Sequence, residues 1–222
     1  MITIAIDAVS KSFSRGSEKI SILQNLNLVA KKGEKVAVLG PSGSGKSTLL
    51  SIMAGLDQPD DGKVSILDQD LSSLNESKLT SFRGRNLGIV FQQFHLVRGL
   101  NAKQNVMLPL EINRVPNADK RAMEMLDRVG LANRASHQPS QLSGGECQRV
   151  ALARAIAGKP PVIFADEPSG NLDEQTGIKV MDYLFNLVSE EQSTLILVTH
   201  NKKHSVDCDR TLLLREGQLH AV

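Results

Sequence analysis

A glycine-rich loop near residue 40 is the first feature of the sequence that could carry chemistry. The phosphate-loop pattern G-x-x-x-x-G-K-[ST] is matched by Gly40-Pro41-Ser42-Gly43-Ser44-Gly45-Lys46-Ser47, directly after the apolar run 36–39. Glycines let the backbone curl so that successive N–H groups point at phosphate oxygens. Lys46 would add a positive charge at the β- and γ-phosphates, and Ser47 would offer a hydroxyl to Mg²⁺. The spacing therefore predicts a nucleoside triphosphate site.

A helix is expected directly after this loop, from Lys46 to Gly55. The positive end of its dipole would face the bound anion, and Thr48 in its first turn completes the predicted nucleotide-binding set. A chance glycine loop is the alternative, and the order strand, loop, helix disfavours it.

A pair of carboxylates follows a second apolar run, 162–165. Asp166 would stand at the carboxyl end of a buried strand, where it could hold Mg²⁺ through water. Glu167 could polarise the attacking water as a general base, an effect typically worth about 10²- to 10⁴-fold in rate. The structural alternative is a solvated Asp-Glu pair at a strand end.

A Ser-Gly-Gly turn supplies a second anion-binding surface in Leu142-Ser143-Gly144-Gly145-Glu146. Ser143 offers a hydroxyl, and the start of the helix expected after it offers unpaired N–H groups. An ordinary serine-capped helix is the alternative, but one chain would then carry two phosphate-binding surfaces by coincidence.

Short apolar runs bounded by turn residues are the elements that must position these groups. Strands are predicted at 36–39, 64–67, 87–91, 162–165 and 195–198. The runs near 36, 162 and 195 do not alternate, as expected of strands buried on both faces of a parallel sheet. Residues 2–7 alternate and predict a half-exposed antiparallel strand, whereas 211–219 predicts a hairpin turning at Glu216-Gly217.

The pattern changes between about 100 and 160. The three-to-four spacing of one helix face is followed by Ala122, Met123, Met125, Leu126 and Val129, and helical patterns continue over 145–158. We therefore predict an α/β core with short antiparallel strands at the front, interrupted by a helical insert.

Composition excludes several other classes. The 222 residues carry a net charge of +2, which gives no strong field for nucleic acid or anionic lipid. With six Phe, one Tyr and no Trp, the chain has few stacking platforms for single-stranded nucleic acid. The two cysteines lack disulfide or zinc spacing, and no apolar run approaches the ~18 residues of a membrane helix. Without a signal peptide pattern either, we expect a cytoplasmic chain that another subunit holds at any membrane.

Leu142–Glu146 resembles the signature motif of ATP-binding-cassette (ABC) ATPases, and the order of the other motifs agrees over essentially the whole chain. The resemblance implies an α/β fold with a P-loop NTPase (RecA-like) core, an N-terminal antiparallel β-subdomain and an inserted helical subdomain. Within one ABC ATPase domain spanning 1–222, residues 1–92 and 160–222 would form the core, and about 93–159 the helical subdomain.

The same resemblance assigns four further residues. Phe13, in Ser10-Lys11-Ser12-Phe13, matches the aromatic that stacks on adenine, with a small core Phe as the alternative. Gln92 matches the loop glutamine that reaches Mg²⁺ and senses the membrane partner. Asp173 matches the carboxylate of a loop that crosses the dimer interface, and His200 the switch histidine at the γ-phosphate. The resemblance then implies that the catalytic residues are Lys46, Glu167 and His200. The implied Mg²⁺ ligands are Ser47, Gln92 and Asp166.

The resemblance also implies a function and partners. The chain would be the ATP-hydrolysing subunit of an ABC transporter-type complex, with ATP and Mg²⁺ bound. Two copies would pair head to tail, each ATP lying between the phosphate loop of one and Ser143–Gly145 of the other. Closure on ATP would drive integral membrane permease subunits from the cytoplasmic face of the inner membrane, where the chain would be peripheral. No nucleic acid is expected as a partner.

A longer run of residues narrows the choice among the kinds of ABC ATPase. The run from Phe164 to Asp173, followed by Thr176-Gly177, is similar to lipoprotein-releasing, macrolide-exporting and cell-division cassettes. Their membrane subunits have large extracytoplasmic domains, which implies lipoprotein release, export or mechanotransmission. The LolD-like and YbbA-like branches both stay open. Four residues depart from the group's pattern: Gln104 stands where Glu is common, Cys147 where Gln is common, Ser169 where Thr is usual and Asn201 where Asp is usual. These departures leave every catalytic group in place but put switch geometry and partner docking in doubt.

Two other functions are weighed against that of an ABC transporter ATPase. A cytosolic ABC ATPase of DNA repair or translation usually carries two cassettes or a long coiled coil, which this sequence lacks. A P-loop small-molecule kinase would leave Leu142–Glu146 and Ser169–Asp173 unexplained.

Cys147, near a helix start, could have a lowered thiol pKa and react beside the ATP interface, whereas an inert packed thiol is the favoured alternative.

Overall fold

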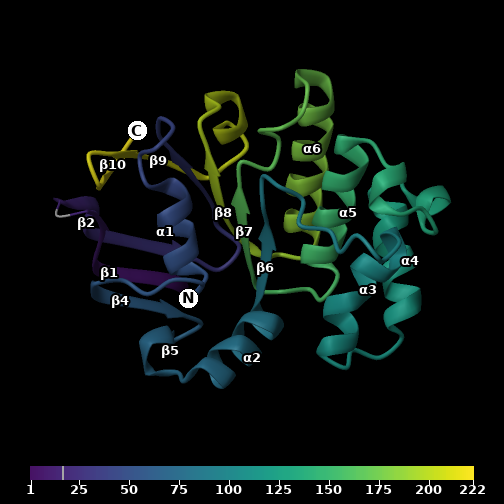
Figure 1. Cartoon of the computed structure of the whole chain (residues 1–222), viewed down its shortest axis with the longest axis horizontal. Coiled ribbons are helices and arrows are strands. Elements are labelled where there is room, and N and C mark those ends of the chain that lie inside the picture. The colour runs from purple at the N-terminus through teal and green to yellow at the C-terminus, as the bar shows by residue number, and fades with distance from the viewer. Residues whose placement is uncertain (17) are drawn as a thin grey trace. The chain divides into compact units, whose positions relative to one another are not determined.

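The computed structural model describes residues 1–16 and 18–222, which form two compact units. The first unit contains 1–83 and 194–222, and the second contains 84–193 (Figure 1). The helical subdomain expected at about 93–159 falls within the second unit, and its separation from the core stays a prediction.

The first unit contains an antiparallel sheet of order β2-β1-β4-β5 and a further set of strands of order β10-β9-β3-β8. Strand β3 runs parallel to both of its neighbours, β8 and β9. The elements are β1 (Ile2–Arg15), β2 (Glu18–Lys31), β3 (Lys35–Leu39), α1 (Lys46–Met53), β4 (Asp61–Ile66), β5 (Gln69–Asp70), η1 (Leu71–Ser73), α2 (Glu76–Asn86, ending in the second unit), β8 (Thr194–Thr199), η4 (Lys202–Ser205), β9 (Arg210–Arg215) and β10 (Gln218–Ala221).

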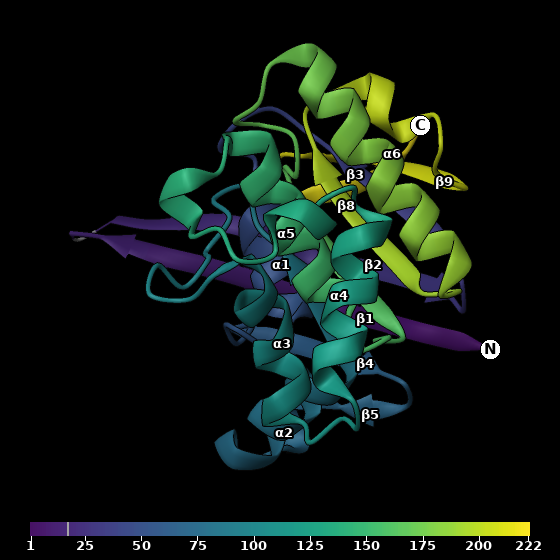
Figure 2. The ribbon, with the colours of Figure 1, turned by 90° about the vertical axis from the view of Figure 1, so that its right-hand side faces the viewer.

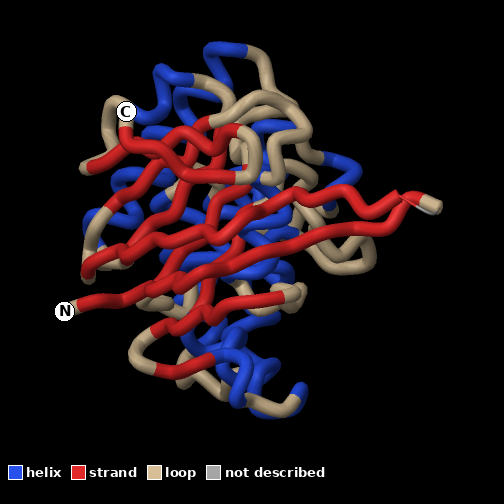
Figure 3. The backbone as a smooth tube through the Cα atoms, turned by 90° about the vertical axis from the view of Figure 1, so that its left-hand side faces the viewer, coloured by secondary structure: helices blue, strands red, loops and turns tan. Residues whose placement is uncertain are grey.

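Strands β1 and β2 form a long hairpin rather than the short strands that the sequence predicts (Figure 3). Each has 14 residues. Ile4 and Ile6 are buried, as the alternation predicts, whereas Ile2 is exposed and Thr3 is buried, against the prediction. Further along the strand, Ala8 adopts a left-handed backbone with φ 51°. The pairing shifts register at several points between the strands, and such bulges interrupt the alternation without ending the strand. The sequence pattern therefore underestimates the length of β1.

The strands that lack alternation are buried on both faces, which confirms that prediction. Val36, Ala37 and Val38 of β3 and residues 195–198 of β8 are all 0% exposed. The predicted terminal hairpin is also confirmed, because β9 and β10 pair on either side of Glu216-Gly217. Both turn residues have positive φ, 51° and 76°, as a two-residue hairpin of the I′ kind requires.

The second unit combines a parallel strand pair with a group of helices. Strands β6 and β7 pair in register from Leu87 with Val162 to Val90 with Ala165. Helices α3, α4 and α5 pack on one another (Figure 2). The elements are β6 (Leu87–Val90), α3 (Ala102–Ile112), α4 (Ala118–Arg128), η2 (Ala132–Arg134), η3 (Pro139–Gln141), α5 (Gly144–Ile156), β7 (Val162–Asp166) and α6 (Glu174–Glu190). Over the whole described chain, no helix combines the length and apolar character needed to cross a membrane.

The helix periodicity predicts one helix and misses another. Ala122, Met125 and Leu126 of α4 are buried, as the three-to-four spacing predicts. Helix α6 is absent from the predicted elements, although Val180 and Leu184 belong to an apolar stripe that is buried at helical spacing. Such a stripe is the signal that could have located α6.

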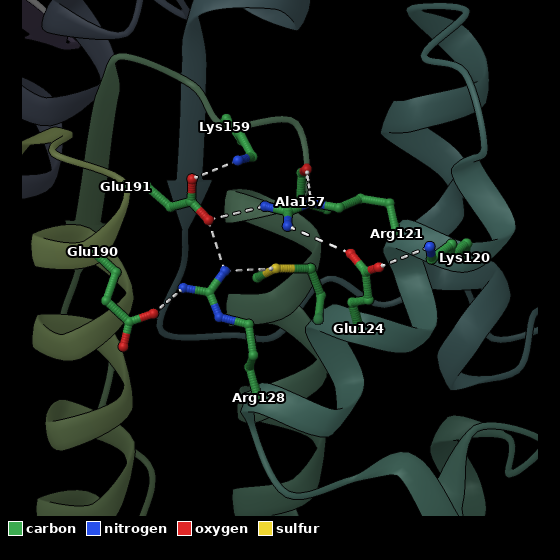
Figure 4. A network of polar contacts seen from close by, with 9 residues as sticks. Lys120, Arg121, Glu124, Arg128, Ala157, Lys159, Glu190 and Glu191 are labelled. Atoms are coloured by element: carbon green, nitrogen blue, oxygen red, sulfur yellow. Dashed lines mark hydrogen bonds and ion pairs between the residues drawn. The ribbon is translucent and has the colours of Figure 1, made fainter.

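A half-buried carboxylate joins three segments of the second unit. Glu191, just after α6, accepts hydrogen bonds from Arg121 Nη2 at 3.0 Å and Arg128 Nη1 at 2.6 Å, both on α4 (Figure 4). Lys159 Nζ lies 3.3 Å from its other oxygen, and Arg121 Nε donates to the Ala157 carbonyl at 3.0 Å. Burial alone would raise the pKa of Glu191, but the bonds from Arg128, Arg121 and Lys159 lower it to about 2.

Replacing Glu191 with Gln should lower the free energy of unfolding by about 2 kcal/mol at pH 7, because three cations lose their shared counter-charge. The pKa of Glu191 in the folded chain, about 2, lies below the ordinary 4.5. Its stabilisation is therefore complete above about pH 5 and is lost as the pH falls from 4.5 towards 2. Urea unfolding followed by circular dichroism, at neutral and acidic pH, measures the difference.

The matched control is Glu190→Gln. The Glu190 carboxylate is 63% exposed and pairs with Arg128. Its loss should change the free energy of unfolding by less than about 0.5 kcal/mol. Equal losses from the two variants, or a Glu191→Gln loss that does not shrink in acid, would contradict the role given to Glu191.

Candidate functional site

In the first unit, the phosphate loop closes around its own lysine. Lys46, the first residue of α1, is buried, and its Nζ donates to the Gly40 carbonyl at 2.9 Å and the Pro41 carbonyl at 3.0 Å. Ser44 N also donates to the Pro41 carbonyl, at 3.2 Å. The loop therefore turns back on itself, with an ammonium group at its centre.

The tight packing of this loop explains its glycines. A Cβ built on Gly40 would lie 2.6 Å from Ser44 Oγ and 2.7 Å from the Leu214 carbonyl oxygen. Gly45 has φ 96°, and a Cβ there would lie 2.7 Å from Ile22 Cγ2. A side chain at either position would force the loop or its neighbours to move.

The donors around the loop fit the phosphates of a nucleotide. Helix α1 begins after Gly45 without a side-chain cap and without an acidic residue in its first turn, so its N–H groups can serve an anion. Among the described residues, the Ser44 hydroxyl is one of the few buried polar groups with no hydrogen-bond partner. A polyphosphate would satisfy the Ser44 hydroxyl and the N–H groups together, with Lys46 adding charge.

The other predicted residues of the first unit lie at or beside this loop. Ser42 and Ser47 are exposed, and Thr48 is half-buried. Leu39 pairs with Thr199 in the parallel β3–β8 ladder, so Gly40 and the exposed His200 leave adjacent strands at the same end.

Asn201, where Asp is usual in the group, keeps a local structural role after His200. Its N–H donates to Thr199 Oγ1 at 3.1 Å, and its Oδ1 accepts from Lys203 N at 3.0 Å. An amide oxygen caps the short helix η4 as a carboxylate would. The residue after His200 therefore preserves the turn.

Phe13 lies on β1 and is 46% exposed. That exposure is too high for the alternative of a small core Phe. Its role towards adenine stays a prediction.

The second unit brings Gln92, Asp166 and Glu167 to one strand edge. Val90 of β6 pairs with Ala165 of β7, so Gln92 and Asp166 follow or end adjacent parallel strands. Glu167 then adopts a left-handed backbone with φ 45°, which is uncommon for a residue other than glycine. The Gly170 N–H donates to the Glu167 carbonyl at 2.9 Å and closes the turn that holds it.

Asn171 completes this cluster, and the sequence does not single it out. Gln92 Nε2 donates to Asn171 Oδ1 at 3.1 Å, and Asn171 Nδ2 donates back to the Gln92 carbonyl at 3.0 Å. A Cβ on Gly170 would lie 3.0 Å from Gln92 Nε2, so this glycine permits the close approach. An Asn directly after a glycine at a strand end is the signal that could have suggested it.

The signature turn begins α5 with a capping box. The Glu146 N–H donates to Ser143 Oγ at 3.3 Å, and the Ser143 N–H donates to Glu146 Oε2 at 2.8 Å. The hydrogen bond from the Ser143 N–H lowers the pKa of Glu146. Ser143 and Gly144 are exposed, whereas Gly145 is buried with its Cα facing Thr176: a Cβ there would lie 2.3 Å from Thr176 Cγ2.

The loop 169–173 connects the signature turn to the Gln92 cluster. A Cβ on Gly144 would lie 3.5 Å from Leu172 Cδ2. Asp173 caps α6, and the bond from the Thr176 N–H lowers the pKa of Asp173. Because Asn171 of this same loop holds Gln92, the loop contacts both predicted sites of the second unit.

Two further side chains of α5 hold the segment that contains Gln92. Gln148 Nε2 donates to the Phe91 carbonyl at 3.2 Å. Arg154 donates to the carbonyls of Phe94 at 3.0 Å and His95 at 2.6 Å. The sequence shows both as polar residues within a helix otherwise rich in small and apolar residues, but nothing in it names their partners.

The hypothesis of a reactive Cys147 is wrong. Burial and the neighbouring Glu146 carboxylate raise the pKa of the Cys147 thiol rather than lowering it. Its Sγ lies 3.5 Å from the Pro139 carbonyl oxygen, and the side chain is 6% exposed. The burial and the raised pKa favour the packed thiol.

Comparison with known proteins gives the family. A family model described as ABC transporter matches residues 23–170. The uncharacterized ABC transporter ATP-binding protein YbbA of Escherichia coli (strain K12) is 48% identical over 218 residues, which cover 97% of this chain and 96% of YbbA. The chain belongs to the ABC transporter ATP-binding family.

Two further comparisons support the same family. The lipoprotein-releasing system ATP-binding protein LolD of Hydrogenovibrio crunogenus is 46% identical over 211 residues, covering 94% of this chain and 92% of its own. The structure titled as a dimeric post-hydrolysis state of the ATP-binding cassette MJ0796 bound to ADP and Pi has a TM-score of 0.91 and 41% identity, with 98% and 96% of the two chains covered.

These comparisons confirm the resemblance to ABC ATPases, the α/β cassette fold and the enzyme class that the sequence predicts. The chain binds ATP and is an ATP-hydrolysing subunit of the ABC transporter type. YbbA and LolD both stand among its relatives, so the two branches stay open. The roles of individual site residues stay predictions.

Both thiols should resist alkylation in the folded chain. Burial raises the pKa of Cys147, and it raises the pKa of Cys208 to about 12. Thiolate is the reacting form, so labelling with iodoacetamide at pH 8 should be slow until urea unfolds the chain. Mass spectrometry of labelled peptides, together with ATPase activity, provides the measurement.

A Cys208→Ala chain serves as the control that isolates Cys147. Rapid labelling of Cys147 in this folded chain, with ATP protecting it and activity falling in step, would restore the hypothesis of a reactive thiol.

Proposed function

We propose that two copies of the chain pair head to tail around two Mg-ATP and drive membrane permease subunits that carry extracytoplasmic domains. The observation that carries this proposal is the presence of two anion-binding surfaces in one chain. The phosphate loop belongs to the first unit, and the exposed helix start at Ser143 belongs to the second. A head-to-tail pair gives both surfaces a use on each nucleotide.

The phosphate loop would hold the triphosphate of ATP. The N–H groups at the start of α1 and the Ser44 hydroxyl donate to phosphate oxygens, and Lys46 exchanges its bonds with Gly40 and Pro41 for bonds to the β- and γ-phosphates. Phe13 stacks on the adenine. The phosphates and the base are thus bound by separate parts of the first unit.

The residues proposed for Mg²⁺ offer the hard oxygen ligands that this ion prefers: a hydroxyl from Ser47, an amide oxygen from Gln92 and a carboxylate from Asp166. Bound Mg²⁺ would neutralise charge on the β- and γ-phosphate oxygens. The hydrogen bond between Gln92 and Asn171 orients the Gln92 amide by fixing its nitrogen, which leaves its oxygen for a ligand.

Glu167 would act as the general base. Its carboxylate takes a proton from water as the water oxygen attacks the γ-phosphorus, and the bond from that phosphorus to the ADP oxygen breaks to release ADP and phosphate. His200 would donate to the γ-phosphate. The turn closed by Gly170 fixes the backbone of Glu167, so little reorganisation is needed at the moment of reaction.

The signature turn would serve the nucleotide of the partner subunit. Ser143 Oγ accepts from the Glu146 N–H, so its own hydrogen can be donated to a phosphate oxygen. Gly144 is exposed at the helix start and has no side chain to cover its backbone N–H group. Asp173 would contact the partner across the same interface.

The membrane role is supported by the relatives. LolD is named for a lipoprotein-releasing system, so release of lipoproteins, export or mechanotransmission from the cytoplasmic face of the inner membrane is the role we propose. The alternative, a cytosolic ABC ATPase of DNA repair or translation, predicts an ATPase activity that no membrane subunit changes. Co-purification with a permease and stimulation by it would separate the two.

Replacing Glu167 with Gln should leave ATP binding intact and slow hydrolysis by at least about 10²-fold, because the general base is lost. Without hydrolysis the closed pair persists, so the variant should run as a dimer with ATP in size-exclusion chromatography. Glu216→Gln, an exposed carboxylate in the terminal hairpin, is the control and should behave as the native chain. Native turnover by the Glu167 variant would show that another residue is the base.

Replacing Ser143 with Ala should reduce ATP hydrolysis at least about tenfold while the monomer still binds nucleotide with native affinity, because Ser143 would serve the partner's ATP. The lost cap should also lower the free energy of unfolding by about 1 kcal/mol. Titration of monomer with ATP and a turnover assay at high chain concentration test the two parts. Loss of nucleotide binding in the monomer would contradict the head-to-tail arrangement.

A further inference from the structure

The ring of Phe13 is approached by a lysine on its own strand. Lys11 lies two residues before Phe13 on β1, so both side chains leave the same face of the strand. Lys11 Nζ lies 5.3 Å from the centroid of the Phe13 ring, within the ~6 Å over which a cation is attracted to an aromatic face. The ring is still 46% exposed, so it keeps surface for a second contact.

The Lys11 ammonium is fixed by the loop that follows α1. Its Nζ donates to Asp57 Oδ1 at 2.9 Å and to the Gln58 carbonyl at 2.6 Å, and the side chain is 11% exposed. Asp57 Oδ1 also accepts from Gln58 N at 2.7 Å, which orders the carboxylate. A cation already held by two acceptors loses little further freedom when it orders a ring.

Two further hydrogen bonds tie the same stretch of β1 to the same loop. Asp60 N donates to the Ser10 carbonyl at 2.9 Å, and Ser12 N donates to Asp60 Oδ2 at 2.8 Å. The residues on either side of Lys11 are therefore fixed independently of the lysine. This keeps the strand in place if the Lys11 charge is removed.

A bulge in β2 joins this region to the phosphate loop. Lys11 pairs with Leu23 and Ser12 with Ser21, which leaves Ile22 as an extra residue in β2. Ile22 packs so closely on Gly45 of the phosphate loop that a Cβ there would lie 2.7 Å from its Cγ2. The hairpin that carries Phe13 is thus packed directly against the loop proposed to bind phosphate.

We propose that Lys11 is a positioning residue for the adenine: anchored by Asp57 and Gln58, it holds the Phe13 ring ready for the base of the bound nucleotide. This inference rests on the proposed function, which gives Phe13 the adenine. A ring ordered in advance loses less freedom when a base stacks on it. The gain in binding affinity applies only to ligands that carry a base, because Lys11 bonds to Asp57 and Gln58 rather than to the phosphate loop.

Equilibrium titrations with ATP and with inorganic tripolyphosphate test the proposal. Lys11→Met keeps the aliphatic stem but removes the charge, so the Kd for ATP should rise about three- to tenfold while the Kd for tripolyphosphate stays unchanged. Lys11→Arg keeps a cation beside the ring and should restore the ATP affinity to within about twofold. The matched control is Lys19→Met, an exposed lysine on β2, which should change neither Kd.

A double variant shows whether Lys11 acts through Phe13. Phe13→Ala should raise the Kd for ATP about tenfold or more, and Lys11→Met should add nothing in that background, because the cation has no ring left to hold. A further loss of the same size in that background, or a matching loss of tripolyphosphate affinity, would overturn the proposal. Thermal unfolding by circular dichroism verifies that each variant is folded.

The two remaining outcomes distinguish this inference from the function on which it rests. Native ATP affinity in Phe13→Ala would refute the assignment of adenine to Phe13, and the role of Lys11 with it. Weak ATP binding in Phe13→Ala together with native binding in Lys11→Met would refute the role of Lys11 alone.

Discussion

The proposed site depends on backbone N–H groups at the starts of helices, which are the donors that an anion would need. At the phosphate loop, these groups become available where the chain leaves the buried strand β3 in a tight turn, and the packing around Gly40 and Gly45 shows how little space that turn has. A net charge of +2 is compatible with phosphate binding because the donors are local and fixed rather than spread over a basic surface. The buried parallel strands are needed to hold these turns in place.

In the second unit, one loop of five residues positions both predicted sites. Residues 169–173 contain Asn171, which holds Gln92, and Asp173, which caps α6 beside the signature turn. A shift of this loop would therefore move the Gln92 amide and the surroundings of Gly144 together. Helix α5 links the same two places, since its first turn is the signature and its Gln148 and Arg154 hold the segment after β6.

Local patterns in the sequence predict those parts of the fold and site that local chemistry determines. The non-alternating runs give β3, β7 and β8, and the glycine spacing gives the phosphate loop, because each depends on neighbouring residues. The length of β1 and the partners of Asn171 and Lys11 depend instead on bulges and on contacts between residues 46 to 79 positions apart. The thiol pKa of Cys147 shows the same limit: its helix position suggests a lowered value, but burial raises it.

Two of the four departures from the group's pattern preserve a backbone contact. Gln104 completes the capping box of α3, where its Oε1 accepts from the Asn101 N–H at 3.0 Å as a Glu oxygen would. Asn201 caps η4 with an amide oxygen in place of a carboxylate.

The other two departures concern packing rather than charge. Ser169 lies where a Cβ on Gly177 would come within 3.2 Å of its own Cβ, so the smaller hydroxyl residue suits a crowded contact. Cys147 is buried against the Pro139 carbonyl, where a larger amide would need more space and a partner. None of the four substitutions replaces a group proposed to bind or cleave ATP. The sequence therefore varies at residues that support the site, while the phosphate loop, Asp166 and Glu167 keep the residue types that the proposed hydrolysis needs.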